Sequence, residues 1–172
     1  MAFRIGVVSD THGVVHPSLA DALAGVDHII HAGDIGGRHV LTALGKIAPV
    51  TSVDGNNDDS TGEDIVRTTI GSLRILLTHI LPRPSRPDPR ILASLQSEPA
   101  DVVVFGHSHL PHDEVLRGIR WFNPASAGPR RFNYPVSVGM MELRGNAWQA
   151  RHIPLDDRSV AALEKWMNQL SK

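Results

Sequence analysis

The sequence contains no cysteine, and none of its apolar runs approaches the length of a membrane span. The first absence excludes disulfide bonds and thiolate metal ligands, and it suits a reducing compartment. The formal net charge is −1, so the chain lacks the basic excess that nucleic-acid-binding proteins carry. No signal-peptide pattern precedes the first apolar run. We therefore expect a cytoplasmic protein, with neither a membrane nor a nucleic acid as its partner.

Histidine is the residue type that the sequence has in excess. Ten histidines stand beside one tyrosine and four phenylalanines in 172 residues. Imidazole is the commonest metal ligand in proteins, so this excess indicates a metal site. A chain of this length can bury a hydrophobic core without the help of disulfides or structural metals, and we expect residues 1–172 to form a single domain.

Short apolar runs alternate with helical patterns in the first third of the chain. We expect strands at residues 3–8, 27–31 and 49–53, with helices starting near Pro17 and Val40 between them. This alternation predicts right-handed βαβ units and a mainly parallel sheet.

The rest of the chain combines hairpins with further helices. Gly71-Ser72 predicts a hairpin turn between residues 64–70 and 73–78. A helix is expected from Asp88 or Pro89, followed by a buried strand at 102–105. We expect the next three strands, at 114–122 (turning at Gly118), 135–143 and 148–153, to form an antiparallel meander before a last amphipathic helix. Together these elements predict a layered α/β sandwich whose central β-sheets mix parallel and antiparallel strands.

Metal-ligand residue types follow five successive predicted strands. In an open α/β sheet such strand ends meet where ligands bind. One polar residue at a strand end is usually a turn former, but a set of five indicates a common site. Imidazole with carboxylate and amide oxygen suits Mn, Fe, Co, Ni or Zn better than Ca or Mg. The candidate ligands are Asp10, His12, Asp34, Asn56, His79, His107 and His109.

The last two of these histidines suggest two ions rather than one. On extended backbone, residues at i and i+2 project to the same side with Cα atoms roughly 6–7 Å apart. That spacing suits His107 and His109 binding two neighbouring ions about 3.5–4 Å apart.

The motifs resemble the ordered set of the calcineurin-like metallophosphoesterases. The matching residues are Asp10-Thr11-His12, Gly33-Asp34, Gly55-Asn56, His79 and Gly106-His107-Ser108-His109. The compact length and Asn123-Pro124-Ala125-Ser126 are most similar to the small YfcE-like phosphodiesterases of bacteria and archaea.

This resemblance implies a dinuclear site. Asp10, His12 and His109 would hold one divalent ion, Asn56, His79 and His107 the other, and Asp34 would bridge them. Manganese is the expected metal, with Fe, Ni, Co or Zn as alternatives. The implied activity is hydrolysis of a small phosphodiester, and of monoesters as an alternative, by a metal-bridging hydroxide. The implied catalytic residues are Asp34, Asn56, Asn57 and His107.

Two positions depart from the family pattern. Many relatives have, after the Asn of the Gly-Asn motif, a His that can protonate the leaving group. Asn57 stands there in this chain, and an amide cannot act as a general acid near pH 7. Ile80 and Leu81 replace a Gly and a second His, which makes the substrate-side wall more apolar. We therefore predict turnover only of esters with good leaving groups.

Several other polar residues have both a structural and a functional interpretation. His31 and the Asn123–Ser126 turn are expected to be structural, and His28 and His152 to lie on the surface. His16 and His112 could replace the missing proton donor. Asp58 either caps a turn or orients a ligand. Arg130 and Arg131 are solvated or contact a phosphate.

A catalytically silent scaffold is the alternative function. The retromer subunit that resembles these enzymes is such a scaffold, and a scaffold is free to lose ligands. All seven ligand positions hold usable residues here, which favours an enzyme. An edge strand or the last helix could also pair two copies of the chain in a homo-oligomer.

Overall fold

Two five-stranded sheets form the centre of the protein in a computed structural model that describes residues 2–59, 63–145 and 147–170. The first sheet has the strand order β10-β9-β1-β2-β3. Its strands are β1 (Phe3–Val8), β2 (His28–His31), β3 (Val50–Ser52), β9 (Ser137–Arg144) and β10 (Ala147–Pro154). The second sheet has the order β4-β5-β6-β8-β7. Its strands are β4 (Ile65–Ile70), β5 (Leu73–Thr78), β6 (Val102–Val104), β7 (Pro111–Leu116) and β8 (Ile119–Pro124).

Both sheets mix strand directions. Strands β1, β2 and β3 are parallel, whereas β9 and β10 add to the β1 edge in antiparallel fashion. In the second sheet β5, β6 and β8 are parallel, and the edge strands β4 and β7 are antiparallel to their neighbours. The predicted mixed α/β architecture is therefore confirmed, including the hairpin in which Ile70 pairs with Leu73.

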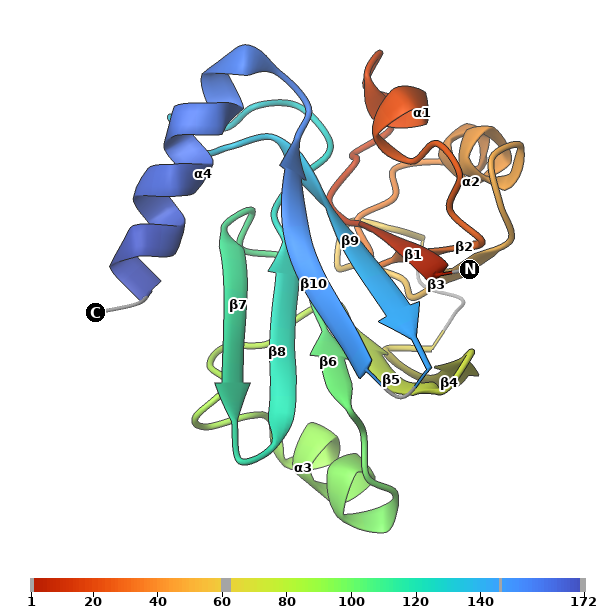
Figure 1. Ribbon diagram of the computed structural model, residues 1–172, viewed down its shortest axis with the longest axis vertical. Helices are drawn as coiled ribbons and strands as arrows, with labels where there is room; N and C mark the ends of the chain where they lie inside the picture. Colours follow the sequence, from red (N-terminus) through yellow and green to blue (C-terminus); the bar gives the residue numbers. More distant parts are fainter. Residues whose placement is uncertain (1, 60–62, 146, 171–172) are drawn as a thin grey trace.

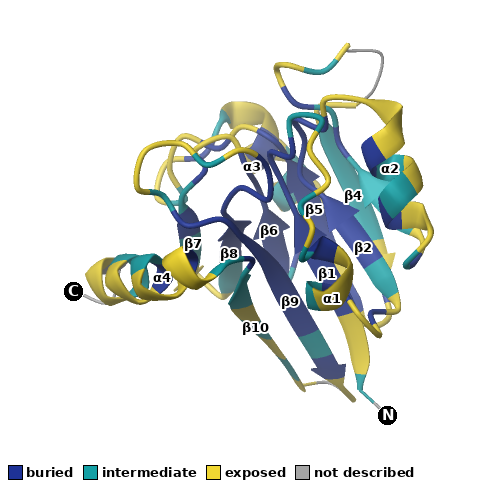
Figure 2. Ribbon diagram, turned by 90° about the horizontal axis from the view of Figure 1, so that it is seen from above, coloured by how far each residue is buried: buried dark blue, intermediate teal, exposed yellow. Residues whose placement is uncertain are grey.

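The central strands are buried on both faces, which explains their continuous apolar runs. Ile5 and Val7 of β1 face the core between the sheets, together with Leu77 of β5 and Phe122 of β8. Val8, one residue further along β1, faces the opposite way and packs with the helices on the outer side. Figure 2 shows the resulting pattern of buried strands and helices with exposed outer faces.

Short helices cover the outer faces of the two sheets (Figure 1). The helices α1 (Leu19–Ala22) and α2 (Arg38–Gly45) pack on the first sheet, and α3 (Pro89–Ser97) packs on the second. Asp88 caps α3 by accepting a hydrogen bond from the amide of Arg90, with Pro89 at the first helical position, as predicted. The last helix, α4 (Asp157–Leu170), lies against β7 and β10.

The predicted antiparallel meander is wrong. β7 and β8 form a hairpin at Gly118, but the chain then crosses to the other sheet, where Phe3 pairs with Leu143 of β9. The reason is that β9 has apolar side chains on both faces. Met140 packs toward the helices and Met141 toward the core between the sheets, so β9 occupies an interior position between β1 and β10.

Among residues 2–59, 63–145 and 147–170, no helix has both the length and the apolar character that a membrane span requires.

Candidate metal centre

The candidate ligands stand on loops that follow strands of both sheets. Backbone hydrogen bonds hold these loops together: the amide of Asp10 donates to the carbonyl of Gly33 at 3.0 Å, and that of Gly106 donates to the carbonyl of His79 at 3.0 Å. The site therefore lies where the carboxyl ends of the strands of the two sheets meet. Asp10 and His12 follow β1, Asp34 follows β2, Asn56 follows β3, His79 follows β5, and His107 and His109 follow β6.

Asp10, His12 and His109 form one group of converging ligand atoms. His109 Nε2 lies 3.4 Å from Asp10 Oδ1, and 3.2 Å from His12 Nε2. The other oxygen of Asp10 accepts hydrogen bonds from the Ser9 hydroxyl at 2.6 Å and the His107 amide at 3.1 Å. These two bonds leave Oδ1 directed at the imidazoles.

Asp34 lies between this group and the remaining ligands. Its Oδ2 is 3.7 Å from His12 Nε2 and 3.4 Å from His79 Nε2. Asp10, Asp34 and His79 also form a group whose ligand atoms all lie within 4.8 Å of one another. The carboxylate of Asp34 is thus placed to contact cations on either side.

His79, Asn56 and His107 lie on the far side of Asp34. His79 Nδ1 donates to the carbonyl of Ala32 at 2.7 Å, which leaves the lone pair of Nε2 directed at Asp34. His107 Nδ1 lies 2.9 Å from Asn56 Oδ1, and the rings of His79 and His107 meet edge-on with centroids 5.3 Å apart.

The donor set fits a cation because buried ligand atoms are left without partners. Asp10 Oδ1 and His79 Nε2 are buried and have no hydrogen-bond partner in the part of the chain that the structure describes. Leaving such an atom unsatisfied costs about 1–3 kcal/mol. A bound cation would satisfy both, since it accepts electron pairs from oxygen and nitrogen.

The ionisation of these groups agrees with that fit. Burial, helped by the nearby charge of Asp34, raises the pKa of Asp10 to about 7, so this carboxyl is fully ionised near pH 7 only when a cation offsets the cost of its burial. Burial lowers the pKa values of His12, His79 and His109, the last to about 4. These imidazoles are consequently neutral near pH 7, the state in which they can bind a metal.

Five of the candidate ligands have a left-handed backbone. Asp10, His12, Asp34, His107 and His109 have φ between 46° and 68°. The reason given above for two ions, an extended backbone at His107 and His109, is therefore wrong. The two side chains nevertheless reach different groups, His109 toward Asp10 and His107 toward Asn56.

Asp58 and the turn at 123–126 shape the loops and lie outside the ligand groups. The carboxylate of Asp58 accepts hydrogen bonds from the amides of Gly55, Ile35 and Gly36 at 2.8–3.0 Å. The turn-capping interpretation of Asp58 is thus confirmed. Elsewhere, Asn123 Nδ2 donates to the Gly106 carbonyl and the Ser126 hydroxyl donates to the Asp10 carbonyl, both at 2.9 Å, which confirms the structural role of that turn.

Among the other histidines, His31 is structural as predicted, whereas the predicted surface position of His152 is wrong. His31 is fully buried, and its Nε2 lies 2.9 Å from the Thr11 hydroxyl. His152, expected on the surface, is half-buried: its ring stacks on Phe122 and its Nε2 donates to the Asn123 carbonyl at 2.7 Å. His28 is also half-buried and contacts Thr51.

The two proposed substitutes for the missing proton donor make local contacts. His16 Nδ1 accepts a hydrogen bond from the amide of Ser18 at 3.2 Å. His112 Nε2 lies 3.2 Å from Glu114 Oε2.

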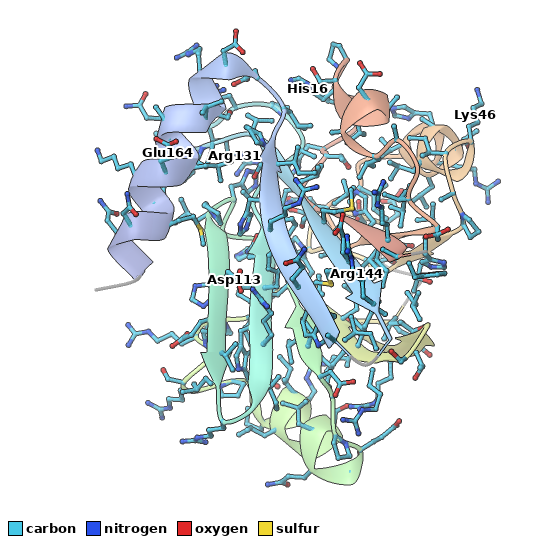
Figure 3. The ribbon with its side chains drawn as sticks, in the orientation of Figure 1. His16, Lys46, Asp113, Arg131, Arg144 and Glu164 are labelled. Carbon is cyan, nitrogen blue, oxygen red and sulfur yellow. The ribbon has the colours of Figure 1, made fainter. Side chains whose placement is uncertain are left out.

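The two adjacent arginines have different roles. Arg130 donates to both carboxylate oxygens of Asp156 at 2.7 and 2.6 Å and to the Tyr134 carbonyl, so it fastens its loop to the start of α4. Arg131, labelled in Figure 3, is exposed, and its Nη2 lies 3.4 Å from His12 Nε2. The sequence does not distinguish these two arginines, and it marks Ser9 only by its position before Asp10.

A family model described as a calcineurin-like phosphoesterase superfamily domain matches residues 3–146. The chain belongs to this superfamily. A probable metallophosphoesterase of Methanothermobacter thermautotrophicus is 34% identical over 159 residues, covering 87% of this chain and 91% of the relative. Membership of the calcineurin-like phosphoesterases implies that the chain binds divalent metal, and the predicted resemblance is confirmed.

Solved structures support the same fold at lower identity. Vacuolar protein sorting 29 of Cryptosporidium parvum superposes with a TM-score of 0.74 at 23% identity, covering 91% of this chain and 93% of that one. A novel archaeal phosphodiesterase superposes with a TM-score of 0.66 at 21% identity, covering 88% and 100%. Because both identities are low, these likenesses concern the fold alone.

Replacing Asp34 tests the shared position of its carboxylate. We expect Mn²⁺ to stabilise the native protein by about 2.7 kcal/mol at one hundred times its dissociation constant, and the substitution Asp34→Asn to remove most of this gain. Thermal unfolding with and without Mn²⁺ measures the effect. Asp21→Asn, at an exposed position of α1, is the matched control. Equal Mn²⁺ stabilisation of Asp34→Asn and the unaltered protein would contradict the assignment.

Acid should destabilise the fold through His31. Burial lowers the pKa of His31 to about 3 from an ordinary value of 6.5. The unfolded chain therefore binds more protons between these values, and the stabilisation is lost as the pH falls from about 6.5 toward 3. We expect the stability difference between the unaltered protein and His31→Gln to shrink by on the order of 2–3 kcal/mol between pH 7 and pH 4. Urea unfolding at each pH measures it, and a pH-independent difference would contradict it.

Proposed function

We propose that this chain is a phosphoesterase that hydrolyses phosphodiesters with the help of two divalent cations, for which manganese is the best candidate. The first cation would be held by Asp10, His12 and His109, the second by Asn56, His79 and His107, with Asp34 shared. The observation that carries this proposal is the position of Asp34 Oδ2, between His12 Nε2 at 3.7 Å and His79 Nε2 at 3.4 Å.

The charges of the ligands favour an anionic substrate. Two divalent cations bring +4 and the carboxylates of Asp10 and Asp34 return −2, so the centre keeps about +2. When bound, the cations would acidify water and neutralise charge on the phosphate. Asn56 and the neutral histidines contribute ligand atoms without cancelling the positive excess, which a site made only of carboxylates would do.

Asn57 is a positioning residue in this proposal. Its amide N–H donates to Asp34 Oδ1 at 2.9 Å and its side-chain Nδ2 donates to Asp34 Oδ2 at 2.7 Å. Burial pushes the pKa of Asp34 upward, but these bonds and the nearby His79 and His12 outweigh it, so the pKa lies below its usual value. Asn57 therefore keeps Asp34 ionised and oriented, and it has no acidic proton for the leaving group.

Arg131 would contact the phosphate of the substrate. Its guanidinium lies at the edge of the first ligand group, 3.4 Å from His12 Nε2, and its side chain is on the surface. Arg130 is held by Asp156, whereas Arg131 can turn toward the oxygens of an incoming ester.

A protein-interaction scaffold is the second candidate. The chain shares its fold with vacuolar protein sorting 29, and the name of that protein denotes a role in protein sorting. This likeness favours the scaffold. The unpartnered ligand atoms Asp10 Oδ1 and His79 Nε2 favour the enzyme.

Hydrolysis of bis-p-nitrophenyl phosphate tests the proposed function directly. Metal-stripped protein should be inactive, recover turnover when Mn²⁺ is added, and lose it in Asp34→Ala. Release of p-nitrophenolate measures the rate. Tight Mn²⁺ binding without any turnover would sink the enzyme proposal and favour the scaffold.

The lack of a general acid at Asn57 should make the rate of hydrolysis depend strongly on the leaving group. We expect the unaltered protein to be at least tenfold slower on alkyl than on p-nitrophenyl diesters, because the alkoxide must leave without a proton. Asn57→His should raise the rate on the alkyl esters relative to the rate on the p-nitrophenyl esters, because it supplies a proton donor although it gives up the side-chain hydrogen bond to Asp34. Asn57→Ala, which only removes the hydrogen bonds to Asp34, should raise neither. Comparable rates of the unaltered protein on both ester classes would refute the idea.

Loss of Arg131 should lower kcat/KM, because the phosphate of the substrate loses a hydrogen-bond donor. Hydrogen bonds to charged groups contribute about 1.5–3 kcal/mol, so Arg131→Ala should lower kcat/KM by about tenfold or more. Arg131→Lys should recover part of the loss. The control is Arg144→Ala, at the far end of β9, whose side chain is 74% exposed (Figure 3). Unchanged kinetics in Arg131→Ala would remove Arg131 from the proposed site.

A further inference from the structure

A cavity opens beside the second ligand group. It has a volume of about 180 Å³, and its lining includes the candidate ligands Asn56 and His79. The same cavity is lined by Thr78, Ile80, Asp64 and Arg90. A substrate phosphate at the ligands would therefore have this cavity next to one of its ester oxygens.

The size of the cavity matches one ring. An engineered protein cavity of about 150 Å³ binds benzene, so a space of this volume has room for a six-membered ring. One side of the lining is apolar: Ile80 lines the cavity and is 45% exposed. The hydroxyl-bearing Thr78 lines the same cavity.

The charges around the cavity disfavour a second anion. Arg90 Nη1 lies 3.0 Å from Asp64 Oδ2, and Arg90 Nε lies 3.5 Å from Asp88 Oδ1. Its positive charge is thus already offset by two carboxylates. A substituent with its own phosphate or carboxylate would therefore find the guanidinium of Arg90 already paired, with no other Arg or Lys among the described residues of the lining.

We propose that this cavity is the subsite for the organic group of the phosphoester, and that it selects an uncharged group of one ring, such as a phenyl or a pentose. The inference rests on the proposed phosphoesterase function, because it assumes a phosphate held at the ligands. It adds the class of substrate: esters with a neutral ring are accepted, and esters that carry a further anionic group on that ring are rejected.

Phosphonates that cannot be hydrolysed test the subsite apart from turnover. Calorimetry on the Mn²⁺-loaded protein compares phenylphosphonate with methylphosphonate, which differ only in the organic group. We expect phenylphosphonate to bind about tenfold more tightly, because its ring is removed from water. 4-Carboxyphenylphosphonate should bind more weakly than phenylphosphonate, and Asp64→Asn should reduce that penalty.

Two variants of Ile80 locate the effect. Ile80→Trp should fill the cavity and abolish the preference for the ring, and Ile80→Ala should weaken it by removing the apolar contact. The control is Val115→Trp, which places the same side chain at a position on β7 that is 65% exposed, and it should keep the full preference. Thermal unfolding confirms that each variant is folded.

The outcomes separate the two proposals. Equal affinities for the two simple phosphonates, or a ring preference that survives in both Ile80 variants, overturns the subsite. Absence of bis-p-nitrophenyl phosphate hydrolysis together with a ring preference that depends on Ile80 overturns the hydrolase and keeps the subsite. Failure of every phosphonate to bind overturns the subsite, and it overturns the hydrolase as well only if bis-p-nitrophenyl phosphate is not hydrolysed.

Discussion

The backbone strain at the strand ends is the constraint on which the site depends. Asp10, His12, Asp34, His107 and His109 all occupy the left-handed region, which costs a residue with a side chain about 1–3 kcal/mol. Such conformations persist only where the surroundings hold them. Here the loops pack closely: a Cβ on Gly55 would collide with the backbone of Asp34, and a Cβ on Gly106 with the side chain of Ser9. Glycine is required at these two positions for the loops to approach so closely.

The two sheets supply the rigidity that holds the strained loops. Each central strand is buried on both faces, between the other sheet and a layer of helix, so its end cannot shift without disturbing the core. Hydrogen bonds from Asp58, Asn123 and Ser126 then fasten the loops to one another. The result is a set of carboxylates and imidazoles kept close together although they gain little from one another. A cation would supply the attraction that the side chains lack, which is how the fold leads to metal-dependent chemistry.

Local patterns in the sequence predicted most of the strands, the helices and the polar residues that gather at the strand ends. They could not predict which sheet each late strand joins, because β9 pairs with β1 from the other end of the chain and that pairing is a long-range choice. The i, i+2 spacing of His107 and His109 could not predict their geometry either, since side-chain alternation holds only for extended backbone and both residues have positive φ. The bonds from Asn57 to Asp34 and the difference between Arg130 and Arg131 depend on loop packing, which leaves no periodic signal.

Anomalous scattering tests the proposed pair of cations that share Asp34 most directly. Crystals grown with Mn²⁺ should show two anomalous peaks, one on each side of the Asp34 carboxylate. One peak should contact Asp10, His12 and His109, and the other Asn56, His79 and His107. A single peak, or peaks that do not touch Asp34, would contradict the dinuclear centre.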